Sequence, residues 1–165
     1  MTKPWLIAAL SLIALPTAAN AGTCEDTFVK KGAVIGGLRF TATVTVPDLA
    51  PATAIYQVKG LALSRGYAVL SEEPNEGSML IEQPQTGKTR SFPVIVSATQ
   101  AGKVATVSLQ ANLRGGMITK EDAAKAEMCG LLNQIKGGKA GLAAAAKGRN
   151  AVGSGGPIVK ISALG

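Results

Sequence analysis

Cys24 and Cys129 are the two cysteines of this 165-residue chain, and they could form a disulfide or act as a redox or metal-binding pair. They lack the C-x-x-C spacing of a redox pair, and the chain contains no histidine to complete a zinc site. In an oxidising compartment we therefore expect a structural disulfide between them. A bond that closes a loop of about 100 residues contributes about 4 to 5 kcal/mol in the chain-entropy model.

Carboxylates are the remaining candidates for acid–base chemistry, because a chain without histidine has no Ser-His-Asp or Cys-His arrangement. Glu72, Glu73 and Glu76 lie close together around a predicted hairpin turn, where a solvated acidic edge is the simplest interpretation. A paired acid and base, or a weak cation site, is the alternative. Calcium prefers about six or more oxygens, and no Asp-x-Asp-x-Asp loop is present. We predict no catalytic residue, no metal site, no cofactor and no enzyme activity.

Two glycine-containing segments could suggest nucleotide binding. Gly87-Lys88-Thr89 resembles the end of a phosphate-binding P-loop, but that motif needs a glycine where Glu82 stands. Gly32, Gly36 and Gly37 follow no clear strand and match no dinucleotide-binding pattern. We therefore predict no nucleotide site in either segment.

The first 21 residues have the order of a cleaved secretory signal. Lys3 precedes an apolar run from Leu6 to Leu15, and Pro16 ends that run. Ala19-Asn20-Ala21 then supplies small side chains at the −3 and −1 positions, which predicts cleavage before Gly22. The mature protein is expected in the periplasm or the surrounding medium.

A membrane anchor and a lipoprotein are the alternatives to a cleaved signal. A spanning helix needs about 20 apolar residues, and this run is roughly half as long. Cys24 could become an acylated amino terminus, but Thr23 and Ala21 do not match the residues that lipoprotein processing favours before the cysteine.

Residues 22–136 are expected to form a single domain, followed by a Gly/Ala/Lys-rich tail at 137–165. The whole chain has a formal net charge of +7, and its tail holds four cations and no acid: Lys139, Lys147, Arg149 and Lys160. We expect a mobile, solvated tail, with contact to an anionic envelope surface as the alternative. The tail has no aromatic residue for base stacking, and an exported protein does not meet nucleic acid, so we predict no nucleic-acid partner.

The elements that must position these residues follow from periodicity. Alternating apolar residues predict strands at 39–46, 67–72, 78–83, 92–99 and 104–113. Pro51 and Gly66 bound a predicted helix, and a second helix is expected from Thr119, with Asp122 in a capping box, to Gly137. The order β-α-β-β-β-β-α predicts an α+β two-layer sandwich with an antiparallel sheet of about five strands and two helices on one face. The pattern predicts no structure for residues 22–38.

The segment from Ala54 to Glu82 also resembles a known class of domain. It contains a helix ending in Arg65-Gly66, the strand Tyr67 to Leu70, an acidic turn through Glu76-Gly77, and Met79-Leu80-Ile81. This order, about a fifth of the chain, is similar to small helix-grip domains of envelope accessory proteins, such as the repeated domains of an outer-membrane assembly lipoprotein. The resemblance implies a binding or scaffolding module, and it transfers no functional residue.

The sequence therefore predicts a non-catalytic exported envelope protein, a periplasmic module that binds another protein or an assembly through a sheet edge or a helix groove. The alternative is a carrier or sensor that holds a small apolar ligand between helix and sheet. An enzyme that uses carboxylates is the third hypothesis.

Overall fold

The computed structural model describes residues 23–83 and 90–152. The predicted signal at 1–21, the Gly87-Lys88-Thr89 segment and the end of the predicted tail lie outside the described residues. The elements in chain order are α1 (Cys24–Thr27), β1 (Val29–Ala33), β2 (Gly37–Pro47), α2 (Pro51–Ser64), β3 (Ala68–Glu73), the 3₁₀ turn η1 (Pro74–Glu76), β4 (Ser78–Gln83), β5 (Phe92–Ala101), β6 (Val104–Leu113), α3 (Glu121–Leu132) and α4 (Gly138–Asn150).

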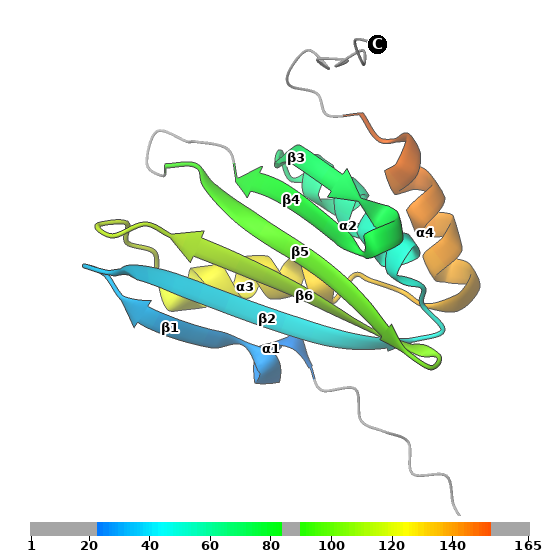
Figure 1. Cartoon of the computed structure of the whole chain (residues 1–165), viewed down its shortest axis with the longest axis horizontal. Helices are drawn as coiled ribbons and strands as arrows, with labels where there is room; N and C mark the ends of the chain where they lie inside the picture. The colour runs from blue at the N-terminus through cyan, green and yellow to red at the C-terminus, as the bar shows by residue number, and fades with distance from the viewer. Residues whose placement is uncertain (1–22, 84–89, 153–165) are drawn as a thin grey trace, which may run out of the picture.

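The fold is α+β, built on one antiparallel sheet with helices behind it (Figure 1). The sheet has six strands in the order β1-β2-β6-β5-β4-β3. The prediction of five strands was therefore too low by one. The additional strand, β1, comes from the segment whose structure the sequence left open, and it pairs with β2 from Val29↔Thr41 to Ala33↔Gly37.

Strict alternation in β2 and β6 places one face of the sheet in the core, as predicted. In β6 every second residue from Ala105 to Leu113 is buried, and the residues between them are partly exposed. In β2 the buried positions include Phe40, Ala42 and Val44. Because side chains of a strand point alternately to opposite faces, the helices need to cover only this one side.

Helix α2 begins at Pro51, and Ile55, Val58 and Ala62 on its inner face are buried, as the sequence predicted. Its end at Gly66 is also confirmed. Gly66 has φ +82°, and its N–H donates to the carbonyl of Leu63 at 3.1 Å. This hydrogen bond gives a partner to a backbone carbonyl in the last turn of the helix.

Helix α3 begins two residues later than predicted and without the expected capping box. Lys120 is the N-cap residue, and no side chain caps the helix. Met128 and Leu131 are buried as expected, while Ile135 is buried beyond the end of the helix at Leu132. The predicted disulfide between Cys24 and Cys129 is present, and it ties α1 to α3 in the core.

The prediction of a mobile tail was wrong for its first part, because residues 138–150 form α4, which packs against α2 (Figure 1). Gly141, Ala145 and Gly148 are the buried residues of α4, and a Cβ at Gly60 on α2 would lie 2.9 Å from Cα of Gly148. The two helices therefore approach at backbone contact. Alanine has the highest helix propensity, so the Ala-rich segment that suggested low complexity also favours a helix.

Gln57 fixes the start of α4 from the buried side of α2. Its Nε2 donates to the carbonyl of Lys136, and its Oε1 accepts from the N–H of the same residue, both at 2.9 Å. Gln57 is a buried polar residue of the core, and these two bonds satisfy both ends of its amide. Among the helices in residues 23–83 and 90–152, none has the length and apolar character that crossing a membrane requires.

Candidate ligand-binding cleft

A cleft of about 590 Å³ lies between α3 and the sheet. Its volume is within the range of about 300 to 1,000 Å³ that is typical of small-molecule sites. The sheet contributes Phe40, Phe92, Val94, Leu109 and Leu113, and α3 contributes Ala124, Met128 and Leu131. The walls are therefore predominantly apolar.

The cleft exists because α3 packs closely only through its second half. Met128, Cys129, Leu131 and Leu132 are the buried residues of the helix, and none from Glu121 to Glu127 is buried. The first half presents the short side chains of Ala123 and Ala124 to the cleft. Alanine leaves space that a leucine or phenylalanine would fill, and the flexible Met117 and Met128 can adapt to different shapes.

One end of the cleft is open at the loop between β6 and α3. Ile118 lines the cleft and is 80% exposed, and the exposed Gly115 and Gly116 line the same end. Arg90, at the start of the segment that leads into β5, is exposed there as well. The apolar interior therefore connects to solvent through a mouth that includes a cation.

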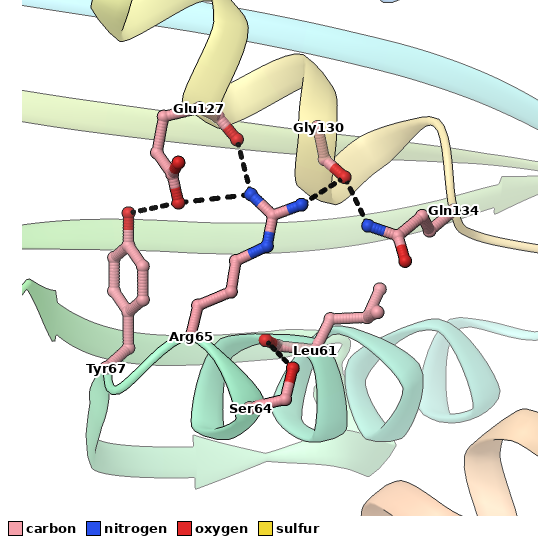
Figure 2. A network of polar contacts seen from close by, with 7 residues as sticks. All are labelled: Leu61, Ser64, Arg65, Tyr67, Glu127, Gly130 and Gln134. Carbon is pink, nitrogen blue, oxygen red and sulfur yellow. Dashed lines mark hydrogen bonds and ion pairs between the residues drawn. The ribbon is translucent and has the colours of Figure 1, made fainter.

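Three polar side chains meet where the cleft borders α3 (Figure 2). Oε1 of Glu127 accepts from the Tyr67 hydroxyl at 3.2 Å and from Nη1 of Arg65 at 3.1 Å. Arg65 also donates to the backbone carbonyls of Glu127 at 3.3 Å and of Gly130 at 2.7 Å. Arg65 follows the last residue of α2, so this cluster links the two helices that cover the sheet.

Burial and the carboxylate of Glu127 favour the protonated form of the Tyr67 phenol. Burial raises the pKa of Tyr67 well above its usual range, and the neighbouring carboxylate of Glu127 raises it further. Arg65 acts in the opposite direction but does not outweigh them. The Tyr67 hydroxyl therefore serves as a hydrogen-bond donor to Glu127.

Glu127 can still accept a hydrogen bond from a ligand. Both bonds from Arg65 and Tyr67 to its carboxylate end on Oε1, and no described residue bonds Oε2. Both Tyr67 and Glu127 line the cleft, together with the polar Gln83 and Thr119. An apolar compound with a hydroxyl or amine group would match this combination of walls and acceptor.

The acidic cluster singled out in the sequence does not contribute to the cleft. Glu72 is half-buried and pairs with Lys59 at 2.9 Å, so its predicted solvent-facing position is only partly correct, while Glu73 and Glu76 are exposed. Within the described part of the chain, no three His, Cys, Asp or Glu residues are arranged to hold a metal ion.

The polar residues of the cleft could not be recognised from the sequence. The pattern around Tyr67 predicts only the start of a strand, and no motif singles out Glu127. A signal was present at Ala124, because a short side chain on the inner face of a helix leaves volume beneath it. The pairing of Glu127 with residues about 60 positions earlier carries no sequence signature.

Comparison with known proteins does not assign the chain to a family. No family model and no curated protein matches it. Among solved structures, the crystal structure of CalU16 from Micromonospora echinospora is similar over 74% of this chain and 91% of that chain, with 10% sequence identity and a TM-score of 0.40.

Proposed function

We propose that this protein is a non-catalytic exported carrier or sensor that holds a small, largely apolar ligand in the cleft between α3 and the sheet. The cleft itself is the observation that supports the proposal, because about 590 Å³ of space under a helix, lined mainly by apolar side chains, is unusual in a close-packed core. Glu127 and Tyr67 give the ligand a polar end, so we expect a hydroxyl or amine on an otherwise apolar body.

The Cys24–Cys129 bond is consistent with an exported protein, because disulfides are rare in the cytosol of most organisms. Together with the predicted signal at residues 1–21, it supports a periplasmic location, with secretion into the medium as the alternative. The ligand would then be an apolar compound of the cell envelope or of its surroundings.

The proposal is tested by binding of a fluorescent fatty-acid probe or an apolar amine probe to delipidated protein. Ala124 lines the cleft, whereas Ala126 on the same helix is exposed and does not line it. Ala124→Trp should fill part of the cleft and weaken binding at least about tenfold, which corresponds to about 1.4 kcal/mol. Ala126→Trp is the matched control and should bind within about twofold of the unaltered protein.

Folding of both variants is checked by circular dichroism and by formation of the disulfide. Delipidated protein that binds neither probe would contradict the proposal. Equal probe affinity in the two tryptophan variants would show that the probe binds elsewhere.

A second candidate function, a protein-binding envelope module, is favoured by the edge of the sheet. All residues of β1 are exposed, and the strand pairs only with β2. An open edge can add a strand from a partner protein. Val29→Glu should then abolish crosslinking to an envelope partner, while Val104→Glu, a similarly exposed valine at the start of β6, should not. Absence of any crosslinked envelope partner under mild conditions would argue against this candidate.

A further inference from the structure

Two exposed isoleucines lie beside the mouth of the cleft. Ile35 is 94% exposed at the tip of the β1–β2 hairpin, and Ile118 is 80% exposed in the loop between β6 and α3. Among the described residues, these are the two most exposed large apolar side chains. Single exposed apolar residues are common on soluble proteins. Two exposed isoleucines beside an apolar cleft instead indicate a surface that contacts a partner.

The two loops that carry the isoleucines are fixed to each other. The N–H of Gly116 donates to the carbonyl of Val34 at 2.7 Å. A Cβ at Gly115 would lie 2.3 Å from the carbonyl oxygen of Ile35, so only glycine permits this approach. Figure 1 shows the hairpin tip and the β6–α3 loop side by side at the left end of the sheet. Ile35 and Ile118 therefore belong to one surface, formed by the β1–β2 turn and the β6–α3 loop, which we call the tip.

Exposed cations surround the tip. Lys31 and Arg39 are paired on the two strands of the hairpin, and Arg114 and Lys120 flank the β6–α3 loop. Glu121 and Asp122 are the acids in the first turn of α3, after this loop, and Glu121 is paired with Lys30 at 3.1 Å. The tip therefore combines an apolar point with a positively charged base.

We propose that the tip docks on an anionic lipid surface, with Ile35 and Ile118 in the interfacial layer and the surrounding cations on the head groups. A lipid surface fits both properties at once, because interfacial binding requires apolar side chains at the point of contact and gains from cations next to anionic head groups. Docking at this end would also bring the mouth of the cleft to the membrane, so that an apolar ligand could move between them without crossing water. This transfer role rests on the proposed function, whereas the docking itself does not.

The first experiment measures partition of the exported, purified protein onto vesicles of phosphatidylethanolamine with phosphatidylglycerol, and onto vesicles of phosphatidylcholine alone. We expect binding to the anionic vesicles that weakens as salt is added. Ile35→Ser/Ile118→Ser should reduce this partition at least about tenfold. Leu142→Ser/Val152→Ser removes two other exposed apolar side chains and should leave partition within about twofold.

A second pair of variants separates the tip from the basic helix α4. Lys139→Glu/Lys147→Glu reverses two exposed charges on α4 and should have a smaller effect than Arg114→Glu/Lys120→Glu beside the tip. The proposal is overturned if the protein does not bind anionic vesicles, or if the α4 variant rather than the isoleucine variant loses binding. Self-association in solution that the isoleucine variant abolishes would assign the tip to a second copy of the chain instead.

The test also distinguishes docking from ligand binding. Ala124→Trp should lose the fluorescent probe but retain its partition onto anionic vesicles, because Ala124 lies inside the cleft. A tryptophan at position 118 would report directly on insertion through its fluorescence, because the only tryptophan of the chain, Trp5, belongs to the predicted signal peptide. In Ile118→Trp, emission should shift to shorter wavelength on vesicle binding, and an unchanged spectrum would refute insertion of this side chain.

Discussion

Reduction of the Cys24–Cys129 bond is expected to lower the free energy of unfolding by about 4 kcal/mol. The two residues are 105 positions apart. A cross-link over a loop of this length removes about 4.7 kcal/mol of chain entropy from the unfolded state at 25 °C, and measured losses for native disulfides in small exported domains are about 2 to 5 kcal/mol. The effect is a large part of the about 5 to 15 kcal/mol that stabilises a typical domain.

Urea unfolding of oxidised and reduced protein, followed by circular dichroism, measures this loss. With a slope of about 2 kcal/mol per molar urea, the midpoint should fall by about 2 M on reduction. Cys24→Ala/Cys129→Ala should lose more than reduction alone, because it also removes two sulfur atoms from the core. A loss below about 1 kcal/mol on reduction would refute the reasoning, since it would mean that the unfolded chain is already restricted without the bond.

Reduction should also weaken the proposed binding of a ligand in the cleft. Cys129 lies in the closely packed half of α3, and the disulfide holds that half beside α1 and the sheet. Loss of this attachment permits α3 to shift relative to the sheet, which changes the shape of the cleft. We expect probe affinity to fall at least about threefold under conditions in which the reduced protein is still folded. Unchanged affinity would show that the remaining contacts of α3 are sufficient.

Three further perturbations have defined outcomes. Arg65→Met should lower the free energy of unfolding, measured with urea, by about 1 to 2 kcal/mol, because it removes the hydrogen bonds from Arg65 to α3. The control is Arg39→Met on the uncovered face of the sheet, which should lower the free energy of unfolding by less than about 0.5 kcal/mol. Raising the pH above about 10, the usual pKa of a phenol, should lower the free energy of unfolding, because the pKa of Tyr67 is raised only in the folded state. The stabilisation that Tyr67 contributes is present below about pH 10 and is lost as the pH rises above that value. When unfolding is measured against pH, this loss should be absent in Tyr67→Phe. Gly148→Leu should detach α4 without unfolding the sheet, since its side chain would collide with the backbone of α2, and hydrogen exchange should then increase in 138–150 alone.

The strands and the first helix could be predicted because their burial is periodic. The alternation in β6 and the Pro51 and Gly66 boundaries of α2 are local features, and the structure reproduces them. The disulfide followed from elimination, because two cysteines without a metal partner have one structural use in an oxidising compartment. These inferences needed no knowledge of contacts between distant segments.

Elements without a local pattern could not be predicted. β1 is exposed along its whole length, so it has no alternation, and it becomes a strand only through its pairing with β2. α4 has a buried face made of glycine and alanine, which becomes visible as a face only when Gly60 of α2 lies opposite Gly148. The polar cluster of the cleft combines Arg65 and Tyr67 with a helix about 60 residues later, and such pairing depends on the tertiary fold.

Small side chains have opposite effects on the packing of α3 and of α4. At α4, Gly148 allows the helix to lie directly against the backbone of α2 at Tyr56 and Gly60. At α3, Ala123 and Ala124 line the cleft, and their short side chains leave its space unfilled. The disulfide at Cys129 and the bonds from Arg65 to the carbonyls of Glu127 and Gly130 attach the second half of α3, where larger side chains already contact the sheet. In the first half, the exposed pair of Lys30 and Glu121 contributes about 0 to 1 kcal/mol, and Lys125 lies over the Phe28 ring at 6.0 Å from its centroid. The covalent and buried attachments of α3 therefore lie away from the open end of the cleft, which is the arrangement that the proposed ligand site needs if ligands are to enter and leave.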